Sequence, residues 1–343
     1  MPYAPFRGRW NSRGGPNHMN RRRLLLLAGS ALASARSLAW AQSTRAHRVA
    51  WLAAGSKADT EASFDAFREG LRDFGYHEGR NLVLDARFGD YSPERTERLA
   101  LELAAMQPEV LVTQGGAARQ AERLSPAIPT AFVYSGDPIA AGLATSFARP
   151  GRHLTGVCLL SLDLVGKRIE ILKEIVPSLG RVAIIANPGH PGEPRELAAS
   201  KAAAERLGIR VSYHPVRNPA ELDAALPAVV ASRAEGAVVF PDALTNSQRS
   251  ALARFFLKNR IPSAAGWAPY AESGFLVSYG PDLLAAYRRS AYFVDRIIKG
   301  AKPADLPIEM PSTIEMVVNR RTATALNLSL PSTIALRADR VID

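Results

Sequence analysis

Cysteine is the residue that this 343-residue sequence has least of, since Cys158 is the only one. No disulfide can form within the chain, and no cluster of cysteine and histidine has the spacing of a zinc site. Cys158 lies in an apolar run, where a free cysteine is typically a small packing residue rather than a nucleophile. The sequence therefore predicts neither a disulfide framework nor a metal site.

Catalytic signatures are missing as well. The sequence contains no H-E-x-x-H pair, no G-x-S-x-G elbow and no P-loop. The segment Gln114–Arg119 (QGGAAR) lacks the third glycine of a dinucleotide-binding fingerprint. We therefore expect a protein that is not an enzyme and that carries no cofactor.

Acidic residues are absent from residues 1–41, which hold seven arginines. Those seven account for most of the formal net charge of +11, so residues 42–343 carry only a mild positive excess. The remaining basic residues are scattered rather than gathered on one helix face, as they would be in a nucleic-acid binder. We expect no nucleic-acid partner.

The apolar runs are too short for a membrane span. Residues 19–41 begin with a basic segment, Arg21–Arg23, and continue with the apolar stretch Leu24–Ala35, which is well short of the roughly 20 residues that a span needs. The small-x-small sequence Ala39–Ala41 then precedes Gln42. This order is typical of a cleaved signal peptide, so we expect a periplasmic protein. An N-terminal anchor helix is the alternative, and the export route (Sec or twin-arginine) and the start codon (Met1 or Met19) stay open.

After Gln42 the sequence alternates between short β-rich runs and longer helical periods. Arg48–Ser56 is typical of a buried strand, and in the next segment Phe64, Phe67, Leu71 and Phe74 share one helix face. The same alternation restarts after a helix at residues 165–176 and continues to the end of the chain. Repeated βα units predict a parallel sheet, and two runs of them predict an α/β protein with two Rossmann-like lobes.

Three crossings between the lobes are expected, near residues 154–160, 274–279 and 306–311. Prolines flank the last of them, so that segment should be stiff and extended. Several short crossings make a hinge, and a hinge permits closure around a ligand. The predicted division assigns 45–156 and 278–304 to lobe 1, and 157–277 and 305–343 to lobe 2.

Three segments resemble one family: Thr130–Gly142 (TAFVYSGDPIAAG), Phe275–Pro281 (FLVSYGP) and Lys302–Asp343. They are similar to the ABC-transporter substrate-binding proteins typified by tryptophan- and tyrosine-binding members, which have a type I periplasmic-binding fold. The likeness extends over roughly residues 47–343. It implies capture of a small molecule, such as an amino acid, an ABC permease in the inner membrane as partner, and a monomeric state. A freestanding periplasmic sensor that docks on a membrane receptor is the alternative.

Candidate ligand-binding residues follow from the rule that ligands sit beyond the carboxyl ends of parallel strands. In the first lobe they are Gly55, Ser56, Gln114, Gly115, Gly116, Tyr134, Ser135 and Asp137. In the second lobe they are Asn187, Asp242, Thr245, Asn246, Trp267 and Tyr270, with Ser278 and Tyr279 at a crossing.

Each assignment has a structural alternative. Gly115 and Gly116 could offer bare backbone N–H groups to a carboxylate, or simply form a tight turn. Asp137 and Asp242 could pair with a ligand ammonium, or cap helices. The tyrosines could hold a flat ligand body or pack between the lobes, and Asn187 could belong to a turn.

Overall fold

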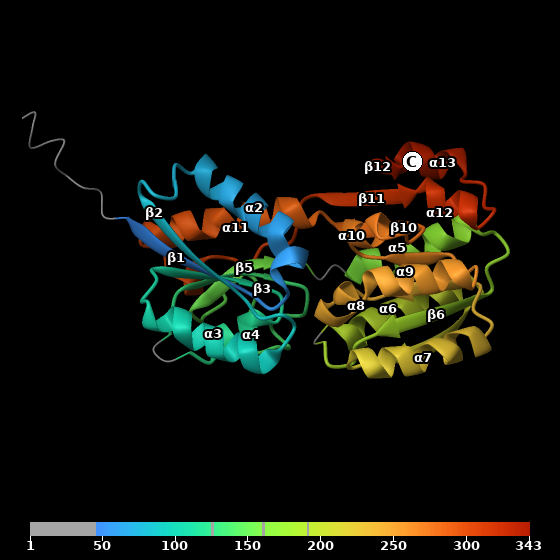
Figure 1. The fold of residues 1–343 in the computed structure, drawn as a ribbon, viewed down its shortest axis with the longest axis horizontal. Coiled ribbons are helices and arrows are strands. Elements are labelled where there is room, and N and C mark those ends of the chain that lie inside the picture. The colour runs from blue at the N-terminus through green and yellow to red at the C-terminus, as the bar shows by residue number, and fades with distance from the viewer. Residues whose placement is uncertain (1–45, 125–126, 160–161, 191) are drawn as a thin grey trace, which may run out of the picture. The chain divides into compact units, whose positions relative to one another are not determined.

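The computed structural model describes residues 46–124, 127–159, 162–190 and 192–343. The predicted signal peptide at residues 19–41 lies outside the described residues. Within them, two sheets alternate with helices, as the repeated βα pattern predicts (Figure 1). No helix in the described part of the chain has both the length and the apolar composition required to cross a membrane.

The first lobe is built on a five-stranded, fully parallel sheet in the order β2-β1-β3-β4-β5. Its strands are β1 (His47–Ala53), β2 (Leu82–Phe88), β3 (Val110–Gln114), β4 (Thr130–Tyr134) and β5 (Leu154–Cys158). Its helices are α2 (Lys57–Asp73), α3 (Pro93–Ala105), α4 (Ala117–Glu122) and α11 (Leu283–Ile298), followed by the 3₁₀ turn η1 (Pro303–Asp305).

Apolar residues on both faces of β1 explain why helices cover this sheet on two sides. Val49 and Trp51 pack in the cluster that contains residues of α2 and α11, whereas Ala50 and Leu52 pack in the cluster with α3 and α4. Successive residues of a strand face opposite sides, so a run that is apolar throughout needs cover on both. Figure 1 shows α2 and α11 over one face and α3 and α4 over the other.

The second lobe is built on a seven-stranded sheet in the order β12-β11-β10-β9-β8-β6-β7. Its strands are β6 (Arg181–Ala186), β7 (Arg210–Pro215), β8 (Gly236–Val239), β9 (Ser263–Ala265), β10 (Val277–Pro281), β11 (Ile314–Asn319) and β12 (Arg340–Ile342). Its helices are α5 (Leu162–Ile175), α6 (Glu193–Arg206), α7 (Pro219–Ala231), α8 (Ala243–Ser247), α9 (Arg249–Lys258), α10 (Ala268–Glu272), α12 (Arg320–Ala325) and α13 (Ser332–Arg337). Two buried clusters, one on each face, again form its core.

Strand β11 departs from the predicted all-parallel arrangement, because it pairs antiparallel to β10. The cause is the path of the chain. The chain leaves this sheet after Pro281, forms α11 in the first lobe, and returns beside the same strand end, where the Asp282 N–H donates to the Thr313 carbonyl at 3.1 Å. A strand that re-enters at the edge where its neighbour left must run in the opposite direction. The sheets are therefore mostly parallel.

The observed crossings also shift the predicted lobe boundaries. Strand β5 continues to Cys158 in the first sheet, two residues beyond the predicted boundary. Strand β10 stays in the second sheet to Pro281, since residues 277–281 pair with β11. The segment before β11 remains on the first lobe as far as Glu309, whose N–H donates to Gly156 O and whose carbonyl accepts from Cys158 N. These backbone pairings cannot be read from hydrophobic periodicity.

Helix α11 belongs to the first lobe although it follows β10 of the second, and it packs closely against α2 at Gly70. A Cβ added at Gly70 would lie 2.3 Å from the carbonyl oxygen of Arg288 and 2.9 Å from the Cβ of Ala291. The absence of a side chain at Gly70 thus lets α11 dock on α2, which positions the start of α11 at the cavity described below.

Gly70→Ala should destabilise the fold. Alanine favours the helix by about 1 kcal/mol, but the clash with α11 should cost about 1–3 kcal/mol and leave a net loss. Glu61→Ala, an exposed change on the same helix, is the control and should have little effect. Urea unfolding of both variants measures the difference; a Gly70→Ala protein more stable than the wild type would contradict the close packing.

Candidate ligand-binding site

A cavity of about 840 Å³ is lined by residues of both lobes. Its wall contains most of the segments that follow strands β1, β3 and β4 in the first lobe and β6, β8 and β9 in the second. Ten of the sequence-predicted residues line it: Gly55, Gln114, Gly115, Gly116, Tyr134, Ser135, Asn187, Asp242, Asn246 and Trp267. The carboxyl ends of the strands thus meet at this cavity, although whether each residue contacts a ligand stays a prediction.

The turn between β3 and α4 shows how the first lobe forms its part of the wall. Gln114 is the last residue of β3, and Gly115 has a φ of +60°, which a residue with a side chain adopts at a cost. The Gly115 N–H donates to Val133 O at 2.9 Å. This N–H group is therefore not the unpaired donor that binding of a carboxylate at Gly115 would require. This turn brings Arg119, near the start of α4, into the cavity wall.

Tyr91 reaches the wall through an unusual turn after β2. Asp90 and Tyr91 have φ angles of 50° and 62°, a region that residues other than glycine rarely occupy. The two N–H groups donate to the carbonyls of Gly55 and Ala54, at 3.2 and 2.8 Å. The Tyr91 hydroxyl then donates to Asp59 at 2.9 Å. The strained turn therefore holds an aromatic ring against the end of β1.

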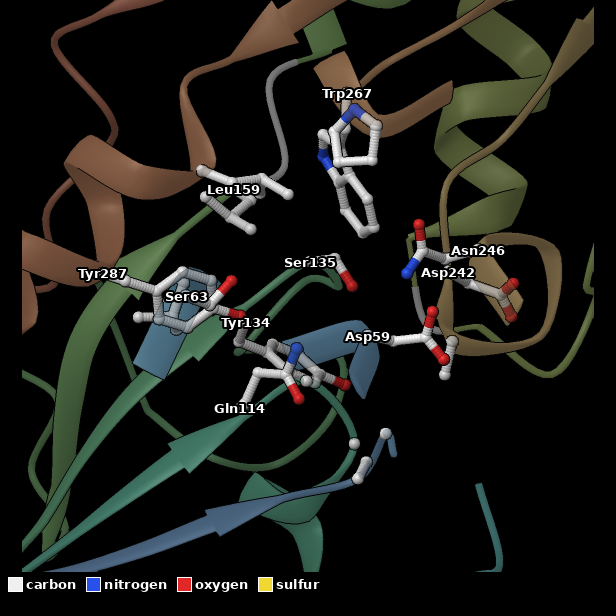
Figure 2. A pocket seen from close by; sticks show the side chains of 18 of the residues that line it. Asp59, Ser63, Gln114, Tyr134, Ser135, Leu159, Asp242, Asn246, Trp267 and Tyr287 are labelled. Carbon is white, nitrogen blue, oxygen red and sulfur yellow. The ribbon is translucent and has the colours of Figure 1, made fainter. Parts of the chain in front are cut away.

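The wall carries both aromatic and polar side chains. In the view of Figure 2, Tyr287 and Leu159 lie towards one side and Asp59, Asp242 and Asn246 towards the other. The rings of Tyr91, Tyr134, Trp267 and Tyr287 all belong to the wall. Such a cavity suits a molecule with an apolar, flat body and a polar end.

Three polar contacts join the lobes around the cavity. Arg249 of α9 pairs with Asp59 of α2 at 2.9 Å. Arg195 of α6 pairs with Asp137, after β4, at 2.5 Å. The hydroxyl of Ser135 lies 3.1 Å from Nε2 of His190, which follows β6. Closure of the lobes is therefore tied to specific side chains at the cavity edge.

The carboxylate of Asp59 is fully engaged in this arrangement. Burial alone would raise its pKa, but hydrogen bonds from Ser56, Arg249 and Tyr91 outweigh burial and hold the pKa below the ordinary value. Asp59 is thus ionised at neutral pH and bridges the two lobes.

Six sequence-predicted residues lie outside the cavity wall: Ser56, Asp137, Thr245, Tyr270, Ser278 and Tyr279. Ser56 caps α2, Thr245 and Asp242 form a capping box at α8, and the Tyr270 hydroxyl lies 2.8 Å from that of Thr245. Asp137 accepts from two N–H groups of its own turn and pairs with Arg195. Ser278 and Tyr279 belong to β10, where Ser278 is buried and Tyr279 packs against the second core. Whether any of these six residues contacts a ligand stays a prediction.

Many wall residues were not among those predicted from the sequence, and Asp59, Tyr91, Arg119, Arg249 and Tyr287 are five of them. Tyr91 comes three residues after the end of β2, so the strand-end rule could have found it. Asp59 and Arg119 sit in the first turns of helices that follow strands. Arg249 and Tyr287 come from helices whose docking depends on the tertiary fold, and no local signal marks them.

Comparison with known proteins assigns the family. The model of the ABC transporter substrate binding protein family matches residues 53–342. The chain belongs to this family. This substrate-binding protein is 22% identical to the "Tyrosine-binding protein" of Clostridioides difficile (strain R20291) over 264 residues, which cover 76% of this chain and 75% of that protein. The family and the fold are those of solute-binding proteins, not enzymes.

Two solved structures share the fold over 87% of this substrate-binding protein and 100% of their own chains. One is a conserved domain protein from Vibrio cholerae, with a TM-score of 0.81 and 24% identity. The other is an ABC domain from Streptococcus pneumonia in complex with L-Trp, with a TM-score of 0.80 and 21% identity. The expectation of two α/β lobes of the periplasmic-binding type is confirmed.

Beneath the second-lobe side of the cavity, this substrate-binding protein holds a cluster of buried charges. The Arg168 Nε donates to the Tyr279 carbonyl at 3.0 Å, and the Glu196 carboxylate lies 3.9 Å from His190. The pKa of Glu196 is raised to about 7: burial is the largest cause, Arg168 opposes it, and Asp242 and Glu193 add to the increase. Burial also lowers the pKa of His190, so the imidazole is neutral at neutral pH.

Glu196 should make stability depend on pH. Between about pH 4.5 and 7 the unfolded chain releases the Glu196 proton while the folded protein keeps it, so the free energy of unfolding falls as pH rises. In Glu196→Gln, the decrease in the free energy of unfolding with rising pH should be smaller by about 1–3 kcal/mol, because a neutral amide has no proton to lose. Urea unfolding at pH 5 and pH 8 measures it. Glu205→Gln, an exposed carboxylate on the same helix, controls for the lost charge; parallel slopes for wild type and Glu196→Gln would contradict the assignment.

Proposed function

We propose that this protein is the extracytoplasmic solute-binding component of an ABC importer and that it captures an amino acid, or a related organic compound, with an aromatic body. The observation that carries the proposal is the cavity of about 840 Å³ between two separately cored lobes. This volume falls within the range of roughly 300–1,000 Å³ typical of small-molecule sites.

The wall supports an aromatic ligand body. Trp267 follows β9 in the second lobe, and Tyr91, Tyr134 and Tyr287 come from the first. Rings contributed by both lobes can enclose a flat molecule only when the lobes are together, so ligand binding and closure are linked. The L-Trp complex and the tyrosine-binding relative support the same ligand class.

The polar groups support recognition of a zwitterion. Arg119 and Asp242 supply a positive and a negative group to the cavity wall, whereas Asp59 and Arg249, which also line it, pair with each other. Water is displaced when the lobes close, and electrostatic attraction is stronger in the enclosed space than in bulk solvent. A ligand that carries both charges would complement this part of the wall.

Trp267→Ala should remove most of the ligand stabilisation in a thermal-shift experiment. A ligand at 100 times its Kd stabilises the folded state by about 2.7 kcal/mol, so L-tryptophan and L-tyrosine should raise the Tm of the wild type. Trp267→Ala should lose this increase and keep the ligand-free Tm within a few degrees, since Trp267 is only partly buried. Phe74→Ala, an exposed aromatic residue outside the cavity, should respond like the wild type.

No shift with any amino acid or ring compound in the wild type would overturn the proposed ligand class.

The importer role predicts processing and transport. The exported protein should begin at Gln42 by intact mass, and cells that lack the gene should lose uptake of the ligand found by thermal shift. Uptake should return with the wild-type gene and not with Trp267→Ala. Normal uptake in the deletion strain, combined with a lost chemotactic or transcriptional response to the same ligand, would favour the sensor instead.

A further inference from the structure

Arg119 is a half-buried arginine in the cavity wall, and no carboxylate among the described residues pairs with it. The other two arginines of the wall are paired: Arg249 with Asp59 at 2.9 Å, and Arg340 with Glu272 at 2.5 Å. A guanidinium that is partly removed from water loses solvation, which an anionic partner normally offsets. An anionic ligand in this cavity would therefore supply the partner that Arg119 lacks.

The groups around Arg119 leave its charge uncompensated. Burial raises the pKa of the neighbouring Tyr134 hydroxyl, which keeps the phenol neutral although Arg119 opposes the effect. His190 is also neutral, because burial lowers its pKa and Arg119 lowers it further, against Asp242. Asp137, which follows Tyr134 on the same loop, is already paired with Arg195. None of these groups supplies the negative charge that Arg119 lacks.

The carboxylates elsewhere in the wall restrict where an anion can bind. Glu272, Asp282 and Asp339 lie near Glu315 in the wall, and their repulsion adds to burial in raising the pKa of Glu315, against Arg340. An anion would be repelled from this acidic group. Asp59 is occupied by three partners in the described structure. The electrostatics of the wall thus direct a carboxylate to Arg119.

We propose that Arg119 binds the carboxylate of the ligand and that this cavity selects carboxylic acids over their neutral amides. The inference rests on the proposed solute-binding function and names the chemistry that the site recognises. A guanidinium can meet a carboxylate with two parallel hydrogen bonds, which adds orientation to charge. The backbone at Gly115 and Gly116 then serves mainly to bring Arg119 into the wall, rather than to bind the anion itself.

The test compares L-tryptophan with L-tryptophanamide, which keeps the ring and the ammonium but has no carboxylate. Calorimetry should show that the wild type binds L-tryptophan at least ten-fold more tightly than the amide. Arg119→Gln should weaken L-tryptophan binding by about ten- to a hundred-fold, as expected for loss of a charged hydrogen bond. The variant should no longer distinguish the acid from the amide, and Arg119→Lys should restore part of the discrimination.

Arg123→Gln is the matched control, because Arg123 is exposed at the end of the same helix and lies outside the cavity wall. It should keep wild-type affinity and discrimination. Equal affinity of the wild type for acid and amide would overturn the proposal, as would an Arg119→Gln variant that loses both equally, since that result indicates a structural role.

If the wild type binds neither tryptophan compound, the aromatic ligand class fails separately. The proposed role of Arg119 is then tested by a thermal-shift screen of carboxylic acids and their amides. Stabilisation by acids in the wild type but not in Arg119→Gln supports the assignment, and any other pattern overturns it.

Discussion

The site depends on a geometric constraint: in a parallel sheet all strands end at the same edge, and here two such sheets present those edges to one cavity. Residues that are distant in the sequence, such as Gln114, Asn187 and Trp267, line the same cavity because each lies at or just after the end of a strand. The two lobes keep separate cores, so closing the cavity does not require rebuilding either core.

Three polar contacts join the lobes around the cavity, and Trp267 of the second lobe also packs against the first core. The Asp59–Arg249 pair is still about a quarter exposed on each side. Such partly exposed pairs contribute little net stability, typically about 0–1 kcal/mol, but they fix the register in which the lobes meet. The strained Asp90–Tyr91 turn and the docking of α11 through Gly70 place aromatic rings at this joint. Contacts within the first lobe thus hold these rings in place, while the ion pair between the lobes adds little resistance to opening.

The cavity wall separates the groups that serve the protein from those that remain for a ligand. The hydroxyls of Thr245 and Tyr270 are hydrogen-bonded to each other, and Thr245 also takes part in the cap of α8. The Asp137 carboxylate accepts from two N–H groups of its own turn and pairs with Arg195. Polar residues at strand ends have two competing uses, capping and recognition, and only the count of partners in the folded state distinguishes them. Arg119 stands out for this reason rather than for any sequence motif.

The sequence by itself determined the alternation of strands and helices, the two-lobed α/β class and the strand ends that form the cavity, because these follow from local hydrophobic periodicity and from the direction of parallel strands. The tertiary structure alone decided the antiparallel entry of β11 and the residues at which the chain crosses between the sheets, since each depends on backbone pairing between distant segments. It also decided which strand-end residues face the cavity. Tyr287 and Arg249 reach the wall from helices, and Tyr270 turns into the core, because side-chain direction is set by packing that no local pattern contains.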